Sequence, residues 1–194
     1  QLSRYGIQVK DPSLDYSQLL SRVREVVSDV RAHSTFRAQI DALGLHVVER
    51  AGPTRFVDSQ TIETDTGVTL QAKKTIICTG GISRQLEVPG AELTATHSDA
   101  WSLTAVPSSL IVIGAGATGA QVASIFNAFG SKIQLFHSGS RILPTEDEDV
   151  SATVAELFRE SGIIVRAAFG TIESFEKTSN GIRMNVLING QRES

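Results

Sequence analysis

The sequence predicts an α/β fold, and three observations in its second half carry this prediction. A short apolar run over 109–113 is typical of a strand buried in a parallel sheet. Glycines follow it at once, and apolar residues then recur at the spacing of one helix face up to Phe129, where Gly130 can end the helix in the left-handed conformation. A second apolar run, 132–136, completes a strand–helix–strand unit.

The three glycines between the first strand and the helix are spaced Gly114-x-Gly116-x-x-Gly119. In this setting Gly114 permits a tight turn, Gly116 leaves the backbone open to a pyrophosphate, and Gly119 lets helix and strand pack closely. The free N–H groups at the helix start would face the phosphates. The pattern therefore predicts a Rossmann-like dinucleotide-binding domain, the alternative being a tight turn that binds no ligand.

Composition excludes several classes of function. The 194 residues suit one large domain or two small ones, and a hydrophobic content of 41% supports a packed core. The net charge of -3 gives no indication of nucleic acid or of an anionic membrane as a partner. The sequence has neither an apolar run long enough to span a bilayer nor a signal-peptide pattern, which favours a cytoplasmic protein.

The reactive side chains predict no catalytic residue and no metal site. Cys78 is the single cysteine, which excludes a disulfide or a dithiol pair within this chain. The four histidines lack metal-ligand spacing, and no Ser/His/Asp set stands out. The acidic run 146–149 could indicate a metal site or the start of a helix that reaches about Ser161. We favour the helix start, because acidic side chains are stabilised at a helix N-terminus.

The first half predicts a helical region followed by short strands. Asp11-Pro12-Ser13 is typical of a helix start, and apolar residues at helical spacing continue to Gly44, as one long helix or two in line. Alternating and apolar patterns then predict strands. These lie at 45–50, 56–57, 61–64, 68–72 and 75–78. Ser98 is expected to cap a short helix in which Trp101 turns inward.

The last part of the chain continues the alternation of helices and strands. The helix that begins in the acidic run is expected to turn four apolar side chains inward. They are Val150, Val154, Leu157 and Phe158. A third parallel strand begins at 162–165, and a hairpin over 169–176 and 182–188 is expected around the turn Ser179-Asn180-Gly181.

Two motifs, in this order, resemble the pyridine-nucleotide disulfide oxidoreductases, flavoproteins that include glutathione reductase, dihydrolipoamide dehydrogenase and mercuric reductase. The first is Thr75-Ile-Ile-Cys-Thr-Gly-Gly81 followed by Val88-Pro-Gly90, which is similar to the second flavin motif of that family. The second is the glycine fingerprint followed by Arg141-Ile-Leu-Pro144 and Glu146-Asp-Glu-Asp-Val150. The resemblance runs over most of the chain from about Leu45.

The resemblance implies an internal fragment of such a flavoprotein. Residues 1–95 would be a partial FAD-binding-domain-like segment, and residues 106–194 an NAD(P)-binding Rossmann-like domain that is incomplete at its C-terminal end. The first flavin phosphate loop and the redox cysteine pair would precede residue 1. The dimerisation domain would follow Ser194, so the complete protein is expected to be a homodimer and this fragment alone to be inactive.

The implied function is the NAD(P)H-binding portion of an FAD-dependent oxidoreductase, which positions the nicotinamide for hydride transfer to flavin. The alternatives are a non-catalytic dinucleotide-binding or redox-sensing module and a folding or interaction unit with an empty site. The expected cofactor contacts fall into three groups. They are Thr79 and Gly80 for FAD; Gly114, Gly116, Ala117, Thr118, Gly119 and Gln121 in the fingerprint; and His137, Ser138 and Arg141 after the second strand.

Three positions depart from common patterns. Ala117 stands where many family members have Tyr, and Gln121 where many have Glu, which brings a standard disulfide-reducing cycle into question. An NAD site normally has a carboxylate at the end of the second strand, where this chain has His137. The missing carboxylate favours NADP(H) over NAD(H), while an indifferent site remains the alternative. Arg141 adds a cation suited to phosphate but decides little alone.

Overall fold

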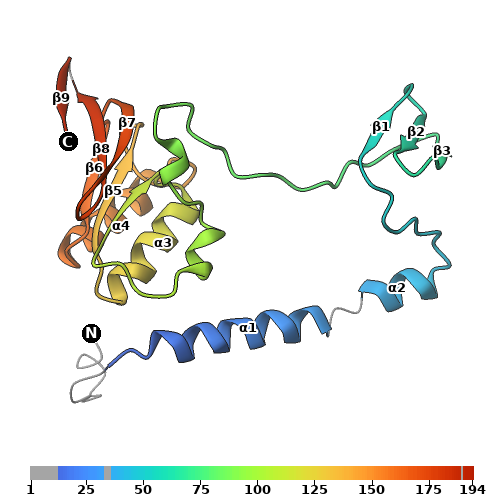
Figure 1. The fold of residues 1–194 in the computed structure, drawn as a ribbon, viewed down its shortest axis with the longest axis horizontal. Coiled ribbons are helices and arrows are strands. Elements are labelled where there is room, and N and C mark those ends of the chain that lie inside the picture. Colours follow the sequence, from blue (N-terminus) through green and yellow to red (C-terminus); the bar gives the residue numbers. More distant parts are fainter. Residues whose placement is uncertain (1–12, 33–35, 189) are drawn as a thin grey trace. The chain divides into compact units, whose positions relative to one another are not determined.

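The parallel sheet predicted around the glycine fingerprint is present. In the computed structural model, β4 (Ser109–Ile113), β5 (Lys132–His137) and β6 (Ile164–Ala167) pair in parallel in the order β4-β5-β6. The structure describes residues 13–32, 36–188 and 190–194. Helix α3 (Ala117–Ala128) joins β4 to β5 and packs on both strands (Figure 1). The predicted α/β class is confirmed.

The end of α3 forms as the sequence predicted. Gly130 has a φ of 98°, in the left-handed region that favours glycine. Its N–H donates to the carbonyl oxygen of Asn127 over 3.0 Å. This bond satisfies a carbonyl that the helix itself leaves free, and the chain turns directly into β5.

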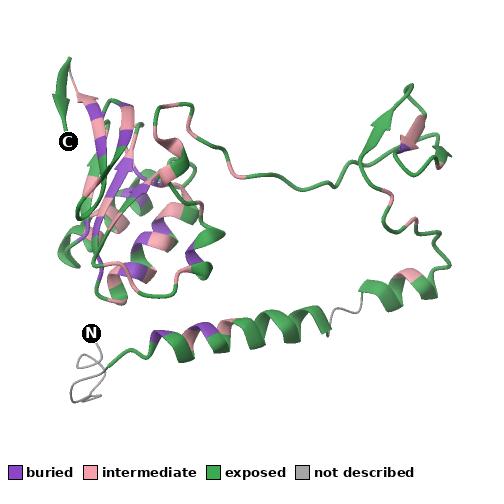
Figure 2. Cartoon of the chain, viewed as in Figure 1, coloured by how far each residue is buried: buried purple, intermediate pink, exposed green. Residues whose placement is uncertain are grey.

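A second, antiparallel sheet follows the parallel one. It consists of β7 (Thr171–Thr178), β8 (Gly181–Ile188) and β9 (Gln191–Glu193), and β7 and β8 form the hairpin predicted around Gly181. Two apolar clusters hold this part of the chain, and Figure 2 shows buried residues on the strands of both sheets and on α3. One centres on Phe126 and Leu135, and the other on Phe136 and Phe175.

The segment before β4 contains two short 3-10 helices, η2 (Ala91–Leu93) and η3 (Asp99–Ser102). Its first part, which includes η2, packs on the antiparallel sheet. The amide of Phe175 in β7 donates to the carbonyl oxygen of Pro89 over 2.9 Å. By contacts, the described residues of 1–24 and 84–194 form one compact unit, and those of 25–83 form another.

The N-terminal helical region is divided into two helices. Helix α1 (Tyr16–Ala32) begins after Asp15, whose carboxylate accepts the amide N–H of Gln18 over 2.9 Å, as an N-cap does. Helix α2 is Phe36–Ala42. The Tyr16 ring meets Phe129 edge to face with centroids 5.9 Å apart. The start predicted at Asp11 and Pro12 lies outside the described residues.

The unit of residues 25–83 has a small antiparallel sheet and little core. Its strands are β1 (Thr54–Phe56), β2 (Thr61–Thr64) and β3 (Thr69–Gln71), near the predicted short strands. Among its described residues Thr64 alone is buried. Among the described residues of both units, no helix is long and apolar enough to cross a membrane.

Two predicted strands of this unit are wrong. Residues 45–50 form no strand, and residues 75–78 are extended but unpaired, with Ile76 86% and Ile77 68% exposed. An apolar strand of a parallel sheet is stabilised only when neighbours pair with its edges and cover its faces. The three described strands of this unit form an antiparallel sheet that does not include residues 75–78.

Helix α4 (Glu148–Glu160) begins in the acidic run as predicted, but two of its four expected inward side chains are exposed. Val154 and Phe158 pack against the core, whereas Val150 is 46% and Leu157 55% exposed. Successive helix positions are about 100° apart. The face centred between Val154 and Ser151 therefore points both Val150 and Leu157 to one side.

The expectations for η3 and for β4 also need correction. Trp101 is 42% exposed, and the small Ala100 enters the core in its place. Ser98 makes no capping bond; the Asp99 carboxylate instead accepts the amide and hydroxyl of Thr96, which lowers the pKa of Asp99. Among the described strands β4 pairs only with β5, which leaves Ile111 36% exposed.

Two matched leucine substitutions test this distribution of burial. Leu135→Ala, at a fully buried side chain on the central strand β5, should lower the free energy of unfolding by about 2–5 kcal/mol because it leaves a cavity. Leu157→Ala should cost less than about 1 kcal/mol, since that side chain is already 55% exposed. Urea unfolding followed by the fluorescence of the single tryptophan, Trp101, measures both. Equal losses would contradict the described core.

Candidate functional site

The glycine fingerprint forms a tight turn between β4 and α3. Gly114 has a φ of 96°, and its amide donates to the carbonyl oxygen of Phe136 in β5 over 2.8 Å. Gly116 is the N-cap of α3, and its carbonyl oxygen accepts the amide of Ala120 over 3.0 Å. The strand, turn and helix therefore follow each other as the sequence predicted.

Gly116 and Gly119 differ in the space that a side chain would find. A Cβ added at Gly119 would lie 1.8 Å from the carbonyl oxygen of Gly114, so any side chain there would separate α3 from β4. A Cβ added at Gly116 would meet nothing within 4 Å. The packing of the protein thus requires Gly119, whereas no packed neighbour in the described structure requires Gly116.

The start of α3 is suited to an anion. Its N-cap is a glycine, so no capping side chain occupies the first-turn N–H groups. Ala117, Thr118 and Gln121 are exposed on this first turn. Free N–H groups and the positive end of the helix dipole at an open, glycine-lined turn form an arrangement that binds phosphate.

Ala115, between the first two glycines, is held by the end of β5 and by the loop that follows it. It is fully buried. Its N–H donates to Nδ1 of His137 over 3.4 Å, and its carbonyl oxygen accepts the amide of Leu143 over 2.6 Å. Both backbone groups of Ala115 are therefore paired, the N–H with the last residue of β5 and the carbonyl oxygen with the loop that follows, which ties both to the fingerprint.

Of the three residues expected after the second strand, His137, which is the last residue of β5, is the one joined to the glycine turn by a hydrogen bond in the described structure. Ser138 is exposed next to it. The Arg141 guanidinium donates through Nη2 to the carbonyl oxygen of Pro144 over 3.2 Å, while Nη1 is buried without a partner among the described residues. One donor group of Arg141 is thus hydrogen-bonded within its own loop.

Thr79 and Gly80 lie on the exposed, unpaired stretch that follows β3. Gly80 has a φ of 72°, and a Cβ there would meet nothing within 4 Å. The described residues around them build no cradle that could be tested for a fit to FAD. Their expected contact with a flavin stays a prediction.

Sequence reasoning missed Ala115, Leu143 and Gly139. Ala115 and Leu143 act through backbone groups, so their side-chain types carry no signal. Leu143 does have a positive φ of 47°, which L-residues adopt only under constraint. Gly139 could have been noticed as a glycine beside a candidate ligand-binding histidine, although its contact with the ring is visible only in three dimensions.

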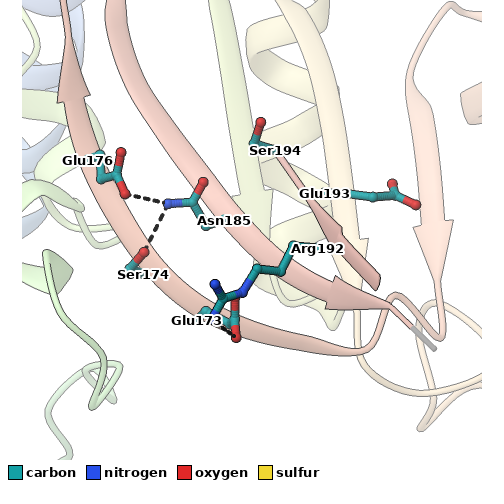
Figure 3. A pocket seen from close by; sticks show the side chains of 7 residues that line it. All are labelled: Glu173, Ser174, Glu176, Asn185, Arg192, Glu193 and Ser194. Carbon is teal, nitrogen blue, oxygen red and sulfur yellow. Dashed lines mark hydrogen bonds and ion pairs between the residues drawn. The ribbon is translucent and has the colours of Figure 1, made fainter. Parts of the chain in front are cut away.

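A polar hollow of about 570 Å³ lies elsewhere, on the antiparallel sheet (Figure 3). Its lining residues are Glu173, Ser174, Glu176, Asn185, Arg192, Glu193 and Ser194. Asn185 donates to Ser174 and Glu176, and Arg192 pairs with Glu173 over 2.9 Å. These groups satisfy one another, and none belongs to the fingerprint. Across the described ranges, no group of three or more His, Cys, Asp or Glu could hold a metal ion.

Comparison with known proteins gives a consistent result. The family model described as pyridine nucleotide-disulphide oxidoreductase matches residues 11–192. A mercuric reductase from Lysinibacillus sphaericus is 30% identical over 191 residues, which cover 97% of this chain and 34% of the relative. A dihydrolipoyl dehydrogenase from Zymomonas mobilis is 33% identical over 164 residues, covering 82% of this chain and 34% of the relative.

The fold itself is similar to a solved structure. The HOCl-induced flavoprotein disulfide reductase RclA from Escherichia coli superposes with a TM-score of 0.71 at 23% sequence identity, over 93% of this chain and 44% of that one. The chain thus spans 34% of the length of each of the two curated relatives and less than half of the solved one.

Alanine substitutions separate the two glycines. Gly119→Ala should lower the free energy of unfolding by at least about 1–3 kcal/mol, because its Cβ would lie 1.8 Å from a backbone oxygen. Gly116→Ala should change it by less than about 1 kcal/mol, since the N-cap has open space. Urea unfolding measures both values. A tolerated Gly119→Ala would contradict the close approach of α3 to β4.

Proposed function

Because the chain belongs to the pyridine nucleotide-disulphide oxidoreductase family, we propose that its glycine turn binds NAD(P)H and positions the nicotinamide for hydride transfer to FAD in the complete protein. The predicted family resemblance is confirmed, and the chain is part of an oxidoreductase family whose members are flavoproteins. The proposal concerns the finer role, namely which cofactor this segment holds and with which residues.

The observation that carries the proposal is the contrast between Gly116 and Gly119. A glycine that folding requires either has packed neighbours where a Cβ would go, as Gly119 has, or has a positive φ, as Gly130 has. Gly116 has no such neighbours, its φ of -74° suits any residue, and it lies at an uncapped helix N-terminus. A pyrophosphate that approaches the backbone at this point explains why the position lacks a side chain.

The groups at the turn would then contact different parts of the nucleotide. The first-turn amides of α3, from Ala117 and Thr118, would donate to the pyrophosphate, and the helix dipole would favour its negative charge. His137, at the end of β5, would face the adenosine ribose, where an NAD site has a carboxylate. The loss of that carboxylate, together with the exposed Ser138 hydroxyl, favours NADPH over NADH.

The complete protein is proposed to work as an FAD-dependent homodimer. This chain spans 34% of the length of its first two curated relatives, so a flavin cradle and an acceptor site would come from other segments. When bound, FAD would supply the hydride acceptor, and the residues described here would bind and orient the nucleotide.

One observation favours a second candidate, a non-catalytic dinucleotide-binding or redox-sensing module. Ala117 and Gln121 are exposed on the first turn of α3, where many family members have Tyr and Glu. Neither residue blocks a nucleotide, but both alter the surroundings of a standard disulfide-reducing cycle. In the complete protein, loss of the flavin absorbance band on addition of NADPH, at a rate fast enough for catalytic turnover, would support the enzyme over the sensor.

The proposal predicts that Gly116→Val abolishes nucleotide binding while the fold survives. The branched side chain would occupy the space left for the pyrophosphate, and nothing else in the described structure lies within 4 Å of that Cβ. Calorimetry with NADPH measures the affinity, and the urea unfolding midpoint serves as the control for folding. Unchanged affinity in a folded variant would mean that the fingerprint is only a turn.

The choice of nucleotide is tested at His137. His137→Glu should shift preference toward NADH, because a carboxylate accepts hydrogen bonds from ribose hydroxyls and repels a 2′-phosphate. Any NADPH preference of the unmodified chain should also shrink as salt rises, since a partly exposed phosphate contact is screened. Calorimetric titration of both nucleotides into both proteins gives the ratio of affinities. If the ratio were the same in both proteins, His137 would not be the residue that distinguishes NADPH from NADH.

The chain of 194 residues should not turn over by itself. It has one cysteine, so it holds no dithiol pair that could pass electrons to a disulfide. NADPH oxidation followed with added FAD and a disulfide or quinone acceptor is expected to stay at the rate without protein. Clear turnover, with flavin retained through gel filtration, would contradict this expectation.

A further inference from the structure

A glycine outside the fingerprint controls the space around His137. A Cβ added at Gly139 would lie 2.9 Å from Nε2 and 3.2 Å from Cδ2 of the His137 ring. These distances are too short for an unstrained contact, so the ring and a side chain at position 139 cannot both keep these places. The backbone of Gly139 lies outside the left-handed region, so its conformation alone does not explain the glycine.

The ring, and not the backbone, is the part that would move. The carbonyl oxygen of Gly139 accepts the amide of Ala168 over 2.8 Å, which anchors position 139 to the end of β6. The contact atoms on His137 belong to the far edge of a side chain that can rotate. Alanine at position 139 would therefore displace the imidazole and leave the loop in place.

The position of the ring also sets its tautomer. A backbone amide can only donate, so the hydrogen bond from Ala115 requires a lone pair on Nδ1 of His137. The neutral ring then carries its hydrogen on Nε2, the nitrogen beside Gly139. Displacement of the ring from Ala115 would remove the bond that selects this tautomer.

From these contacts we propose that Gly139 is a positioning residue for nucleotide choice, acting through His137. Its missing side chain lets the ring stay on the Ala115 amide, in the tautomer that offers Nε2–H as a donor to the 2′-phosphate of NADPH. The inference rests on the proposed function, because it assigns a role within the same nucleotide site. In this role Gly139 does not contact the phosphate. It determines which His137 nitrogen donates, because its missing side chain leaves room for the ring.

The first test needs no nucleotide. Two-bond ¹H–¹⁵N spectra of the full chain distinguish the two neutral imidazole tautomers, and His137→Ala assigns the signals. The unmodified chain should show His137 with its hydrogen on Nε2, and Gly139→Ala should shift this signature together with the Ala115 amide. The control is Gly81→Ala, at a glycine in the other unit whose added Cβ would meet nothing within 4 Å. A ring protonated on Nδ1 in the unmodified chain would overturn the inference.

The second test measures nucleotide choice. Gly139→Ala should reduce the ratio of NADPH to NADH affinity by about tenfold, the value of one hydrogen bond to a charged group. In a His137→Ala background the same change should leave the ratio unaltered, because the residue through which Gly139 acts is gone. Equal effects in both backgrounds, or none in the unmodified chain, would overturn the positioning role.

The two proposals fail in different ways. A chain that binds neither NADPH nor NADH, whatever the spectra show, overturns the proposed function and with it the role of Gly139 in nucleotide choice. A chain that binds nucleotide through an intact Gly116, but whose preference ignores Gly139→Ala, overturns only the inference about Gly139.

Discussion

The close approach of α3 to the end of β4 is the contact on which the rest of the C-terminal unit depends. No side chain fits between Gly119 and the Gly114 carbonyl oxygen, since a Cβ would lie 1.8 Å from it. This contact sets where α3 begins and therefore where its free amides point. It also places Ala115 so that its N–H and carbonyl oxygen reach His137 and Leu143. The candidate site is thus a consequence of backbone packing.

Recognition at this site would rely on backbone dipoles more than on charged side chains. The first turn of α3 carries no basic residue, and its exposed side chains are Ala117, Thr118 and Gln121. Arg141 donates one of its hydrogen bonds to the carbonyl oxygen of Pro144. The polar hollow on the antiparallel sheet lies away from the fingerprint, and Asn185 and Arg192 pair with other residues of its lining. Fixed amides are suited to a phosphate common to both nucleotides, so under the proposed function the choice between them would fall to His137 and its surroundings.

The two units differ in how much of their apolar sequence they bury. The unit around β5 places Phe126, Ile133 and Leu135 almost wholly out of solvent, because helices and strands cover them. The unit of residues 25–83 leaves Ile76 and Ile77 exposed, although their sequence is as apolar as that of β4. Burial requires partners, and the small antiparallel sheet of that unit offers none to residues 75–78. Apolar character alone therefore does not make a strand.

By itself, the sequence determined the order strand, glycine turn, helix and strand, the hairpin at Gly181 and the family, because periodicity and glycine spacing act between residues close in the chain. Tertiary structure alone decided that Ile76 stays unpaired, that Ala100 replaces Trp101 in the core, and that Leu157 faces away. It also decided that Ala115 and Gly139 constrain His137. Such outcomes depend on which distant atoms share a space, and no local pattern encodes a contact between β4, the loop after β5 and the end of β6.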